Sequence, residues 1–421
     1  MQYKRHMTDI HSRYIQLVGE IFEKHPTVQK DGFTAGAYKP GLQGMEGWDE
    51  VLGHPWRSYR TLHVAGTNGK GSVSSMLAAA LSARGKAVGL YTSPHLVDFR
   101  ERMKVIRGGS FTMPEEGFVV RFLEDYSAAM EGLSFFEITT GMAFKWFEEQ
   151  GVDAAVIETG LGGRLDSTNI IIPEVSVVTS IGLDHCALLG DTRAKIAAEK
   201  AGIFKKGVPA VVGTRDDQTA PVFEEAAARI GAELHFADDA ALCPLEMDLQ
   251  GEWQAENLRT ALTALHCIGI DDPDLGAVSR TARITGLRGR WEYLGPDMVC
   301  DIGHNPPALE VNFRRLEESG KPITIVYGVM ADKDLDGIAP LMPSGAHYIL
   351  CAPATTRALP AEKLSERLSL LRPDLDTEVA ASVAEAVETA RKSAKCRPGS
   401  LIYIGGSTFV VAEAMKTLEM I

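Results

Sequence analysis

The stretch Thr61–Ser72 carries the clearest chemical signal in the sequence. Its first residues form a short apolar run, which predicts a buried strand. Its second half reads Gly66-Thr67-Asn68-Gly69-Lys70-Gly71-Ser72, and the glycines let a ligand approach the backbone closely. Apolar residues at helical spacing follow from Val73 to Leu81. A glycine-rich turn that opens a helix binds anions through its backbone N–H groups. We therefore predict a nucleotide phosphate site, with Lys70 reaching the outer phosphates.

This stretch departs from the standard phosphate-loop pattern G-x-x-x-x-G-K-[ST]. Val64 stands where the first glycine is expected, and Gly71 separates Lys70 from Ser72. The alternative interpretation is a tight strand-to-helix turn with an incidental lysine. The order of strand, glycines, lysine, hydroxyl and helix favours the nucleotide site.

Polar residues also follow three other predicted strands, at the ends where open α/β sheets place their ligands. These polar segments are Thr92–His95, Glu158 and Ser180–His185. Glu158 is a candidate Mg²⁺ ligand, because Mg²⁺ prefers hard oxygen donors and bridges the outer phosphates of a nucleotide. The alternative for Glu158 is a solvated glutamate at a strand end.

Other candidate residues have an ordinary interpretation beside the functional one. A lone histidine such as His185 is more often structural than a metal ligand. Lys200 lies on a predicted helix, where a lysine is usually a solvated cation. Phe135 and Phe136 are usually core residues, and their functional interpretation is a flat surface for an aromatic ring.

Short apolar strands alternate with helices along the chain, which predicts an α/β fold with a mainly parallel sheet covered on both faces. An amphipathic helix is predicted around Tyr14–Phe22, and the glycine-rich segment Asp31–Gly53 is predicted to be a loop. A helix is predicted to follow Leu133–Thr140 and to run through Trp146.

The strand–helix pattern restarts at Arg288, after the glycine-containing segment Ile284–Arg290. We therefore predict two domains, residues 1–287 and residues 288–421. The first is expected to be a P-loop ATPase-type domain that binds ATP and substrate, and the second a smaller Rossmann-like α/β domain.

Composition excludes several classes of protein. The 421 residues are 45% hydrophobic, which is enough for a substantial core. The net charge of −13 argues against general nucleic-acid binding. The sequence contains no C-x-x-C pattern, so neither a zinc site nor a disulfide framework is indicated. Met1–His25 does not resemble a secretory signal, and no stretch is apolar enough to span a bilayer. We therefore expect a cytoplasmic protein.

Six motifs occur in a fixed order along most of the chain. They are Gly66–Ser72, Thr92-Ser93-Pro94-His95-Leu96, Glu158-Thr159-Gly160-Leu161-Gly162-Gly163-Arg164-Leu165-Asp166, Leu183-Asp184-His185, Glu199-Lys200-Ala201-Gly202-Ile203 and Asp301-Ile302-Gly303-His304-Asn305-Pro306. Together they resemble folylpolyglutamate synthase/dihydrofolate synthase, a branch of the Mur ligase superfamily. The resemblance runs from about Thr61 to the C-terminus.

The resemblance implies an ATP-dependent amide ligase. The family makes an acyl phosphate from a pteroate or folate carboxylate and ATP, and the amine of L-glutamate then displaces phosphate. The implied cofactors are ATP and two Mg²⁺ ions. The implied partners are small molecules, namely dihydropteroate or a reduced folate and L-glutamate. Neither nucleic acid nor membrane is expected as a partner, and the protein is expected to be a monomer.

The resemblance also assigns roles to single residues. Contacts to ATP are implied for Gly66, Thr67, Asn68, Gly69, Lys70, Gly71, Ser72, Asn257, Arg290 and Asp301. Binding of Mg²⁺ is implied for Ser93, Glu158 and His185. The pterin-bearing substrate would contact Phe136, Glu137, Thr139, Leu161, Gly162, Gly163 and Arg164. His304, as a catalytic residue, and Ser407 are expected near the incoming glutamate. Lys200 is expected to be carbamylated, which would turn a cation into an anion able to serve a second Mg²⁺.

One segment departs from the family pattern. Ala37-Tyr38-Lys39-Pro40-Gly41-Leu42 stands where family members often carry a Leu-Gly-Leu-x-Arg-like segment that helps to hold the pterin. It stays open at this point whether the chain glutamylates dihydropteroate, extends folates, or does both.

Three other functions compete with this interpretation. A peptidoglycan-precursor ligase, another Mur-type amino-acid ligase, shares the central domain, but the 65 residues before Gly66 are too few for its nucleotide-sugar domain. A nucleotide-driven P-loop binding module would leave Arg164, Lys200 and Asp301–Asn305 without a role. An acid-substrate kinase would share only the first half-reaction.

Overall fold

The computed structural model describes residues 2–27, 41–396 and 399–419. The chain divides into two compact units. One consists of Met1–Asp248 and Trp253–Leu287, and the other of Leu249–Glu252 and Arg288–Ile421. Each unit has a sheet and a hydrophobic core of its own.

The N-terminal unit is built on an eight-stranded sheet of order β4-β3-β2-β5-β1-β6-β7-β8. Its strands are β1 (Arg60–Ala65), β2 (Val88–Tyr91), β3 (Met103–Arg107), β4 (Ser110–Thr112), β5 (Ala154–Glu158), β6 (Ser176–Val178), β7 (Ala210–Val212) and β8 (Leu234–Phe236). The six strands β2, β5, β1, β6, β7 and β8 are parallel, whereas β3 and β4 pair antiparallel at one edge. The predicted mainly parallel sheet is therefore confirmed.

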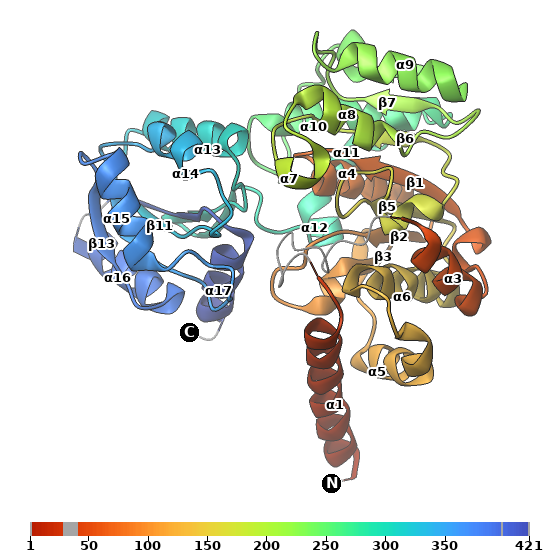
Figure 1. Ribbon diagram of the computed structural model, residues 1–421, viewed down its shortest axis with the longest axis horizontal. Coiled ribbons are helices and arrows are strands. Elements are labelled where there is room, and N and C mark those ends of the chain that lie inside the picture. Colours follow the sequence, from red (N-terminus) through yellow and green to blue (C-terminus); the bar gives the residue numbers. More distant parts are fainter. Residues whose placement is uncertain (1, 28–40, 397–398, 420–421) are drawn as a thin grey trace. The chain divides into compact units, whose positions relative to one another are not determined.

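Helices cover both faces of this sheet (Figure 1). The helices of this unit are α1 (Gln2–Lys24), α3 (Gln43–Leu52), α4 (Lys70–Ala83), α5 (Glu116–Asp125), α6 (Phe135–Glu149), α7 (Cys186–Leu189), α8 (Arg193–Ala201), α9 (Ala220–Ile230), α10 (Trp253–Cys267), α11 (Leu275–Val278) and α12 (Thr281–Thr285). Ala155 and Ile157 of β5 pack into the same core as α6. Successive side chains of a strand face opposite ways, so Val156 lies on the other face, where α4 contacts β5.

Two sequence-based assignments of helices were wrong. Within Asp31–Gly53, predicted to be a loop, residues 31–40 lie outside the described part, but α3 is a helix. Its buried side chains Met45, Trp48 and Leu52 recur at helical spacing and pack towards α6. Gly44 and Gly47 lie within this helix, and because glycine is typical of loops, the helical spacing of the apolar residues was missed. The helix expected to follow Leu133–Thr140 in fact begins at Phe135, because Ser134 caps it.

The C-terminal unit has a six-stranded sheet of order β13-β12-β11-β14-β10-β9, parallel except for β9. Its strands are β9 (Glu292–Gly295), β10 (Met298–Cys300), β11 (Ile323–Tyr327), β12 (His347–Leu350), β13 (Asp376–Val379) and β14 (Leu401–Gly405). Its helices are α13 (Pro306–Glu318), α14 (Leu335–Ile338), α15 (Ala361–Leu371), α16 (Val383–Cys396) and α17 (Thr408–Glu419). This is the Rossmann-like α/β arrangement that the sequence predicts.

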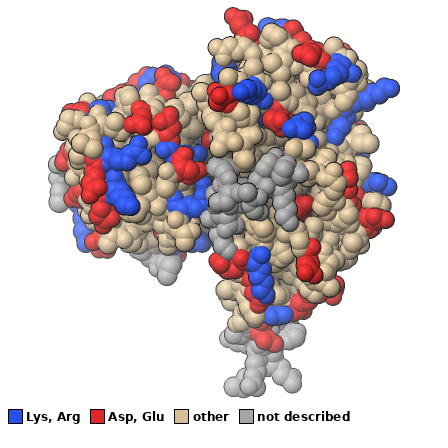
Figure 2. All heavy atoms as spheres, viewed as in Figure 1, with Lys and Arg blue, Asp and Glu red and all other residues tan. Residues whose placement is uncertain are grey.

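Charge on the molecular surface is mixed. On the face shown in Figure 2, acidic and basic side chains are interspersed within each unit. A membrane span would need a long apolar helix, and none of the described helices meets that requirement.

Candidate nucleotide and ligase site

The turn between β1 and α4 has the backbone that a phosphate loop requires. Gly66 and Gly69 adopt φ angles of 151° and 87°, in the region that favours glycine. A Cβ on Gly66 would collide with the Thr179 hydroxyl, and a Cβ on Gly69 would collide with the Asn257 side chain. The loop therefore packs tightly between the end of β6 and helix α10, which brings the predicted ATP contact Asn257 to it.

Hydrogen bonds tie this loop to the segment after β6. The Thr67 backbone N–H donates to the Ser180 carbonyl at 2.8 Å, and the Asn68 N–H donates to the Ser180 hydroxyl at 3.1 Å. The Thr179 hydroxyl donates to the Asn68 carbonyl at 2.6 Å, and Gly182 N–H donates to the Thr67 hydroxyl at 3.0 Å. Two polar strand ends that the sequence singled out thus lie side by side.

Two lysine amines converge on one carbonyl of the loop. Lys70 Nζ donates to the Gly66 oxygen at 3.1 Å and to the Thr67 oxygen at 3.2 Å. Lys200 Nζ, which arrives on α8, donates to the same Gly66 oxygen at 2.7 Å. Lys200 is buried, with 3% of its surface exposed. Burial, together with the nearby Lys70 cation, lowers the pKa of Lys200 to about 7. At neutral pH a large share of this amine is therefore uncharged.

The predicted metal ligands Ser93 and Glu158 are brought together. Glu158 ends β5 next to the central strand β1 and is 3% exposed. Ser93 follows the neighbouring strand β2, and its backbone N–H donates to Glu158 Oε2 at 3.3 Å. His185 immediately precedes α7 as its N-cap with φ at 54°, and its backbone N–H donates to Asp184 Oδ1 at 2.9 Å. The role of His185 as a ligand stays a prediction.

These residues fit a magnesium–nucleotide complex better than a closed protein metal site. Among the described residues, no three His, Cys, Asp or Glu side chains gather closely enough to hold an ion by themselves. Mg²⁺ usually keeps several waters and needs only one or two carboxylates in addition to substrate phosphates. One buried carboxylate and a hydroxyl beside a phosphate loop meet that need.

The loop after Glu158 is held by a network of buried polar groups. The Leu161 N–H donates to Asp166 Oδ2 at 2.8 Å, and the Thr168 hydroxyl donates to Asp166 Oδ1 at 2.5 Å. His63 of β1 contacts the Thr168 oxygen through Nε2 at 2.8 Å. Burial raises the pKa of the Asp166 carboxyl and lowers the pKa of His63 to about 3, so His63 is neutral. Sequence reasoning gave these three residues no role, although Asp166 closes one of the quoted motifs.

The same loop rests on α8 beside Lys200. The Arg164 backbone N–H donates to the Glu199 carbonyl at 2.8 Å, and the Arg164 guanidinium pairs with Glu199 Oε1, also at 2.8 Å. A Cβ on Gly163 would lie 2.8 Å and 2.9 Å from the Glu199 and Lys200 carbonyl oxygens, so only glycine fits there without a shift. Gly162 has φ at 71°. The predicted substrate loop and Lys200 therefore form one structural neighbourhood.

Helix α6 supplies one partly buried ring and two side chains with internal partners. The Phe136 ring contacts Gly160, where a Cβ would lie 2.5 Å from it. Glu137 Oε2 instead accepts from the Ser134 N–H and hydroxyl, both at 2.7 Å, and so caps its own helix. The Thr139 hydroxyl donates to the Phe136 carbonyl at 3.1 Å. Contact of Glu137 and Thr139 with substrate stays a prediction, whereas Phe135, 2% exposed, is a core residue.

The predicted residues of the C-terminal unit gather at the carboxyl ends of two neighbouring parallel strands. Asp301 follows β10 and Ser407 follows β14, which pairs with β10. Trp291 N–H, next to Arg290, donates to Asp301 Oδ2 at 2.8 Å. His304 Nδ1 lies 3.0 Å from the Ile302 carbonyl, and the Ser407 hydroxyl accepts from Phe409 N–H at 3.1 Å. This edge is where open α/β sheets bind ligands.

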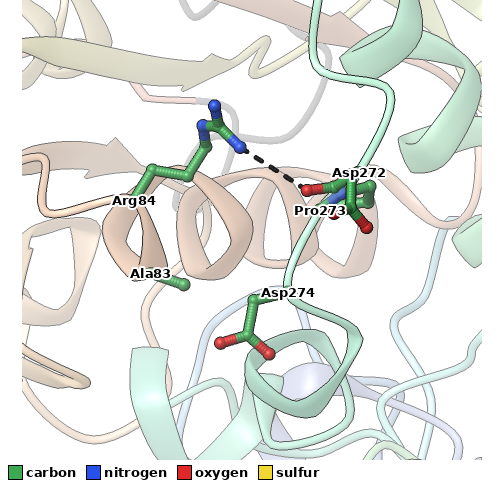
Figure 3. A pocket seen from close by; sticks show the side chains of 5 residues that line it. All are labelled: Ala83, Arg84, Asp272, Pro273 and Asp274. Carbon is green, nitrogen blue, oxygen red and sulfur yellow. Dashed lines mark hydrogen bonds between the residues drawn. The ribbon is translucent and has the colours of Figure 1, made fainter.

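A pocket of about 440 Å³ lies at the opposite end of α4 from Lys70 (Figure 3). It is lined by Ala83, Arg84, Asp272, Pro273 and Asp274. Arg84 Nη1 donates to the Asp272 carbonyl at 3.5 Å. Its position separates it from the phosphate loop, so it contributes nothing to the candidate site.

Family models match both units. Residues 64–241 match the Mur ligase middle domain, and residues 289–408 match the Mur ligase glutamate ligase domain.

Named relatives match most of the chain. The dihydrofolate synthase/folylpolyglutamate synthase of Escherichia coli K12 is 34% identical over 85% of this chain and 86% of its own length. A Haloferax volcanii protein named "Probable bifunctional folylpolyglutamate synthase/dihydropteroate synthase" is also 34% identical, over 90% of this chain. The chain spans only about half of that relative, 48% of its length.

Solved structures agree with this fold over nearly the whole chain. The Mycobacterium tuberculosis folylpolyglutamate synthase complexed with ADP superposes with a TM-score of 0.84 at 27% identity, covering 97% of this chain and 99% of that one. E. coli FolC in complex with DHPP and ADP gives 0.81 at 29% identity, covering 93% and 96%. The Yersinia pestis bifunctional enzyme complexed with AMPPNP and Mn gives 0.80 at 28% identity, covering 92% and 95%. The chain therefore belongs to the folylpolyglutamate synthase/dihydrofolate synthase family of Mur ligases.

Proposed function

We propose that this protein is an ATP-dependent amide ligase that adds L-glutamate to dihydropteroate, to folates, or to both. The acceptor carboxylate attacks the γ-phosphorus of ATP, which yields an acyl phosphate and releases ADP. The amine of L-glutamate then attacks the acyl carbon, and phosphate leaves. A carboxylate is a poor electrophile, and phosphorylation supplies the leaving group that amide formation needs. The observation that carries the proposal is the convergence of Lys70 and the buried Lys200 on the Gly66 carbonyl of the phosphate loop.

The nucleotide is proposed to lie on the Gly66–Ser72 loop, with contacts from Asn257, Arg290 and Asp301. Backbone N–H groups of the loop and the N-terminus of α4 hold the phosphates, and Lys70 neutralises charge on the transferred phosphoryl group. The contact of Asn257 with Gly69 supports its part in this set. Structures of family members complexed with ADP and with AMPPNP support ATP as the nucleotide.

A divalent metal is proposed to join the nucleotide through Ser93, Glu158 and His185. When bound, Mg²⁺ would neutralise charge on the outer phosphates. The buried carboxylate of Glu158 and the adjacent Ser93 support this donor set. The Mn ion in the Yersinia pestis complex supports a divalent metal in the family.

The acceptor is proposed to contact Phe136 and the loop Leu161–Arg164, and the incoming glutamate to lie near His304 and Ser407. Glu137 and Thr139, which lie near Phe136 on α6, are also proposed to contact the acceptor. The seating of Gly163 and Arg164 on α8 beside Lys200 supports a shared site for acceptor and phosphoryl group. The family structures with DHPP and with L-glutamate support these substrate classes. We also propose that the enzyme acts as a monomer in the cytoplasm.

Lys200 is proposed to carry a carbamate. A neutral amine reacts with CO₂ to form the carbamate anion and release a proton, so the lowered pKa of Lys200 favours the reaction. The resulting anion would attract a second Mg²⁺, whereas a lysine cation would repel it.

Lys200→Ala tests the carbamate. We expect loss of ligase activity with partial rescue by a small carboxylic acid, while the control Lys206→Ala at an exposed site keeps full activity. After incubation with ¹³C-labelled bicarbonate, the wild type should give a carbamate NMR signal that Lys200→Ala lacks. A bare amine in electron density from active, bicarbonate-supplied crystals would contradict the modification.

The ligase activity itself is tested by ADP release with each substrate omitted in turn. A ligase releases ADP and phosphate steadily only when acceptor and glutamate are both present, and mass spectrometry identifies the amide. Steady release without either would favour a nucleotide-driven module. Release with acceptor alone, and no effect of glutamate, would favour an acid-substrate kinase.

A further inference from the structure

Asp301, a proposed nucleotide contact, is held by three hydrogen bonds within the C-terminal unit. Its Oδ1 accepts from Gly303 N–H at 2.7 Å and from Asn312 Nδ2 at 2.9 Å. Its Oδ2 accepts from Trp291 N–H at 2.8 Å. A carboxylate oxygen has two lone pairs, so Oδ1 is saturated and Oδ2 keeps one acceptor position among its described contacts. The carboxylate can therefore take one further donor, and only on Oδ2.

Asn312 sets this arrangement from helix α13. It is 8% exposed, and its amide nitrogen donates both to Asp301 Oδ1 and, at 3.1 Å, to the Tyr403 hydroxyl. An amide NH₂ has two hydrogens, and both are used. The carbonyl end of the amide would repel a carboxylate, so the side chain has one favourable orientation.

Tyr403 is the fixed end of this chain of contacts. It lies on β14, is fully buried, and its ring centroid is 6.0 Å from that of Trp291 and 6.3 Å from that of Phe313. Its hydroxyl is thus held by core packing rather than by a mobile side chain. A buried polar group is costly without a partner, and the Tyr403 oxygen gives the second N–H of the Asn312 amide an acceptor.

The network also reaches Arg290 through a strained residue. Trp291 adopts φ at 47°, which is unusual for a bulky residue. The Arg315 guanidinium lies 4.4 Å from the centroid of the Trp291 ring. The backbone N–H of Trp291 donates to Asp301 Oδ2. Because Arg290 directly precedes Trp291, the contacts that orient Asp301 also fix the position of the Arg290 backbone.

A carboxylate repels the phosphates of ATP, so Asp301 must meet the nucleotide at a hydrogen-bond donor. ATP offers two kinds, the ribose hydroxyls and the adenine amino group. We propose that Asn312 and Tyr403 are positioning residues for nucleotide binding. Asn312, held by the Tyr403 hydroxyl, saturates Oδ1 of Asp301 together with Gly303 N–H, which leaves Oδ2 for one donor of the nucleoside. The inference rests on the proposed function, because it takes ATP as the ligand of Asp301.

The test measures KM for ATP and kcat in Asn312→Leu and Tyr403→Phe, with Glu310→Gln at an exposed position of α13 as the control. Loss of a hydrogen bond to a charged group should raise KM for ATP about tenfold in Asn312→Leu, with a smaller rise in Tyr403→Phe. KM for acceptor and for glutamate, and kcat, should stay near wild type. Calorimetric ADP binding should weaken in parallel, and Tyr403→Phe keeps the test usable if Asn312→Leu folds poorly.

Two further experiments distinguish a positioning role of Asn312 from a general disturbance of the fold. In an Asp301→Ala background, Asn312→Leu should raise KM for ATP no further, because the group that it orients is gone. Among 2′,3′-dideoxyATP and purine riboside triphosphate, the analogue that lacks the donor for Asp301 should be insensitive to Asn312→Leu.

Two negative outcomes remain distinguishable. An active wild type whose KM for ATP is unchanged in Asn312→Leu, or is raised equally for all three nucleotides, would overturn the inference. A wild type without ligase activity would instead overturn the proposed function.

Discussion

At the scale of single residues, two lysines beside the phosphate loop are the groups that could neutralise the charge of bound phosphates. Lys70 and Lys200 share the Gly66 carbonyl, and only Lys70 lies at the helix start where a phosphate-loop lysine is expected. Because burial already lowers the pKa of Lys200, we expect Lys70 to be the group that carries positive charge to the transferred phosphoryl. We therefore expect the two lysines to have different tasks.

Lys70→Ala should lower kcat by about 100-fold or more, because it removes charge stabilisation that develops in the transition state. The measurement is steady-state ADP release under saturating ATP, acceptor and glutamate. Lys206→Ala is the matched control on the surface. Near-normal turnover of a folded Lys70→Ala protein would remove the phosphate-loop assignment.

Glu158→Gln should weaken binding of Mg²⁺, because it keeps the size of the side chain but removes its negative charge. The expected result is a shift of the activity curve to higher Mg²⁺ concentration, with partial recovery at high Mg²⁺. Glu225→Gln, at an exposed position of α9, controls for a general loss of acidic charge. If the Mg²⁺ curve of Glu158→Gln matches the wild type, Glu158 is not a ligand.

At the scale of elements, the edge hairpin β3–β4 holds the end of the N-terminal unit. Lys104 of β3 donates to the Gly286 carbonyl at 2.9 Å and lies 5.2 Å from the Phe111 ring centroid. Gly286 has φ at 62°, and a Cβ there would lie 2.5 Å from Phe111. Burial lowers the pKa of Lys104 to about 8, with Glu101 opposing the shift.

This buried lysine should make stability depend on pH. Between pH 8 and 10.5 the unfolded chain still holds the Lys104 proton that the folded chain has lost. The free energy of unfolding should therefore rise with pH in this window, and the penalty is fully present below pH 8. Relative to Lys104→Met, the wild type should gain about 3 kcal/mol across the window. Urea unfolding at several pH values measures this, with Lys206→Met as control, and parallel curves for wild type and Lys104→Met would contradict it.

At the scale of the whole molecule, the open question is how many acceptors one site serves. The reacting carboxylate must reach the same phosphoryl group in both reactions, whether the acceptor is dihydropteroate or a glutamylated folate. One site can serve both if the pterin shifts outward as the glutamyl tail grows. The segment 37–42, which replaces the pterin-holding family segment, lies outside the described residues except for Gly41 and Leu42.

We expect both activities. ADP release should be seen with dihydropteroate and, separately, with tetrahydrofolate, each with glutamate, and mass spectrometry should find the corresponding amides. Omitting glutamate is the control for uncoupled hydrolysis. Turnover with only one acceptor over a wide concentration range would reduce the protein to a single-function ligase.

Features that are local along the chain could be predicted from the amino-acid sequence alone. Strand, glycine turn, lysine and helix follow one another within Thr61–Leu81, so the phosphate loop could be predicted from short-range patterns. The alternation of apolar runs with helices predicted the mainly parallel sheets for the same reason. The ordered motifs predicted the family, because the order of motifs can be read from the linear sequence without knowledge of the packing.

Contacts between distant residues, and the effect of burial on their side chains, became visible only in the folded protein. The contact of Lys200 with Gly66 joins positions 134 apart in sequence, and that of Asn312 with Tyr403 joins positions 91 apart. Strand order and packing set such contacts, and local periodicity does not contain them. Burial likewise lowers the pKa of Lys200, and folding commits Glu137 to capping its own helix. The chemistry of a side chain thus depends on neighbours that the chain supplies only after it has folded.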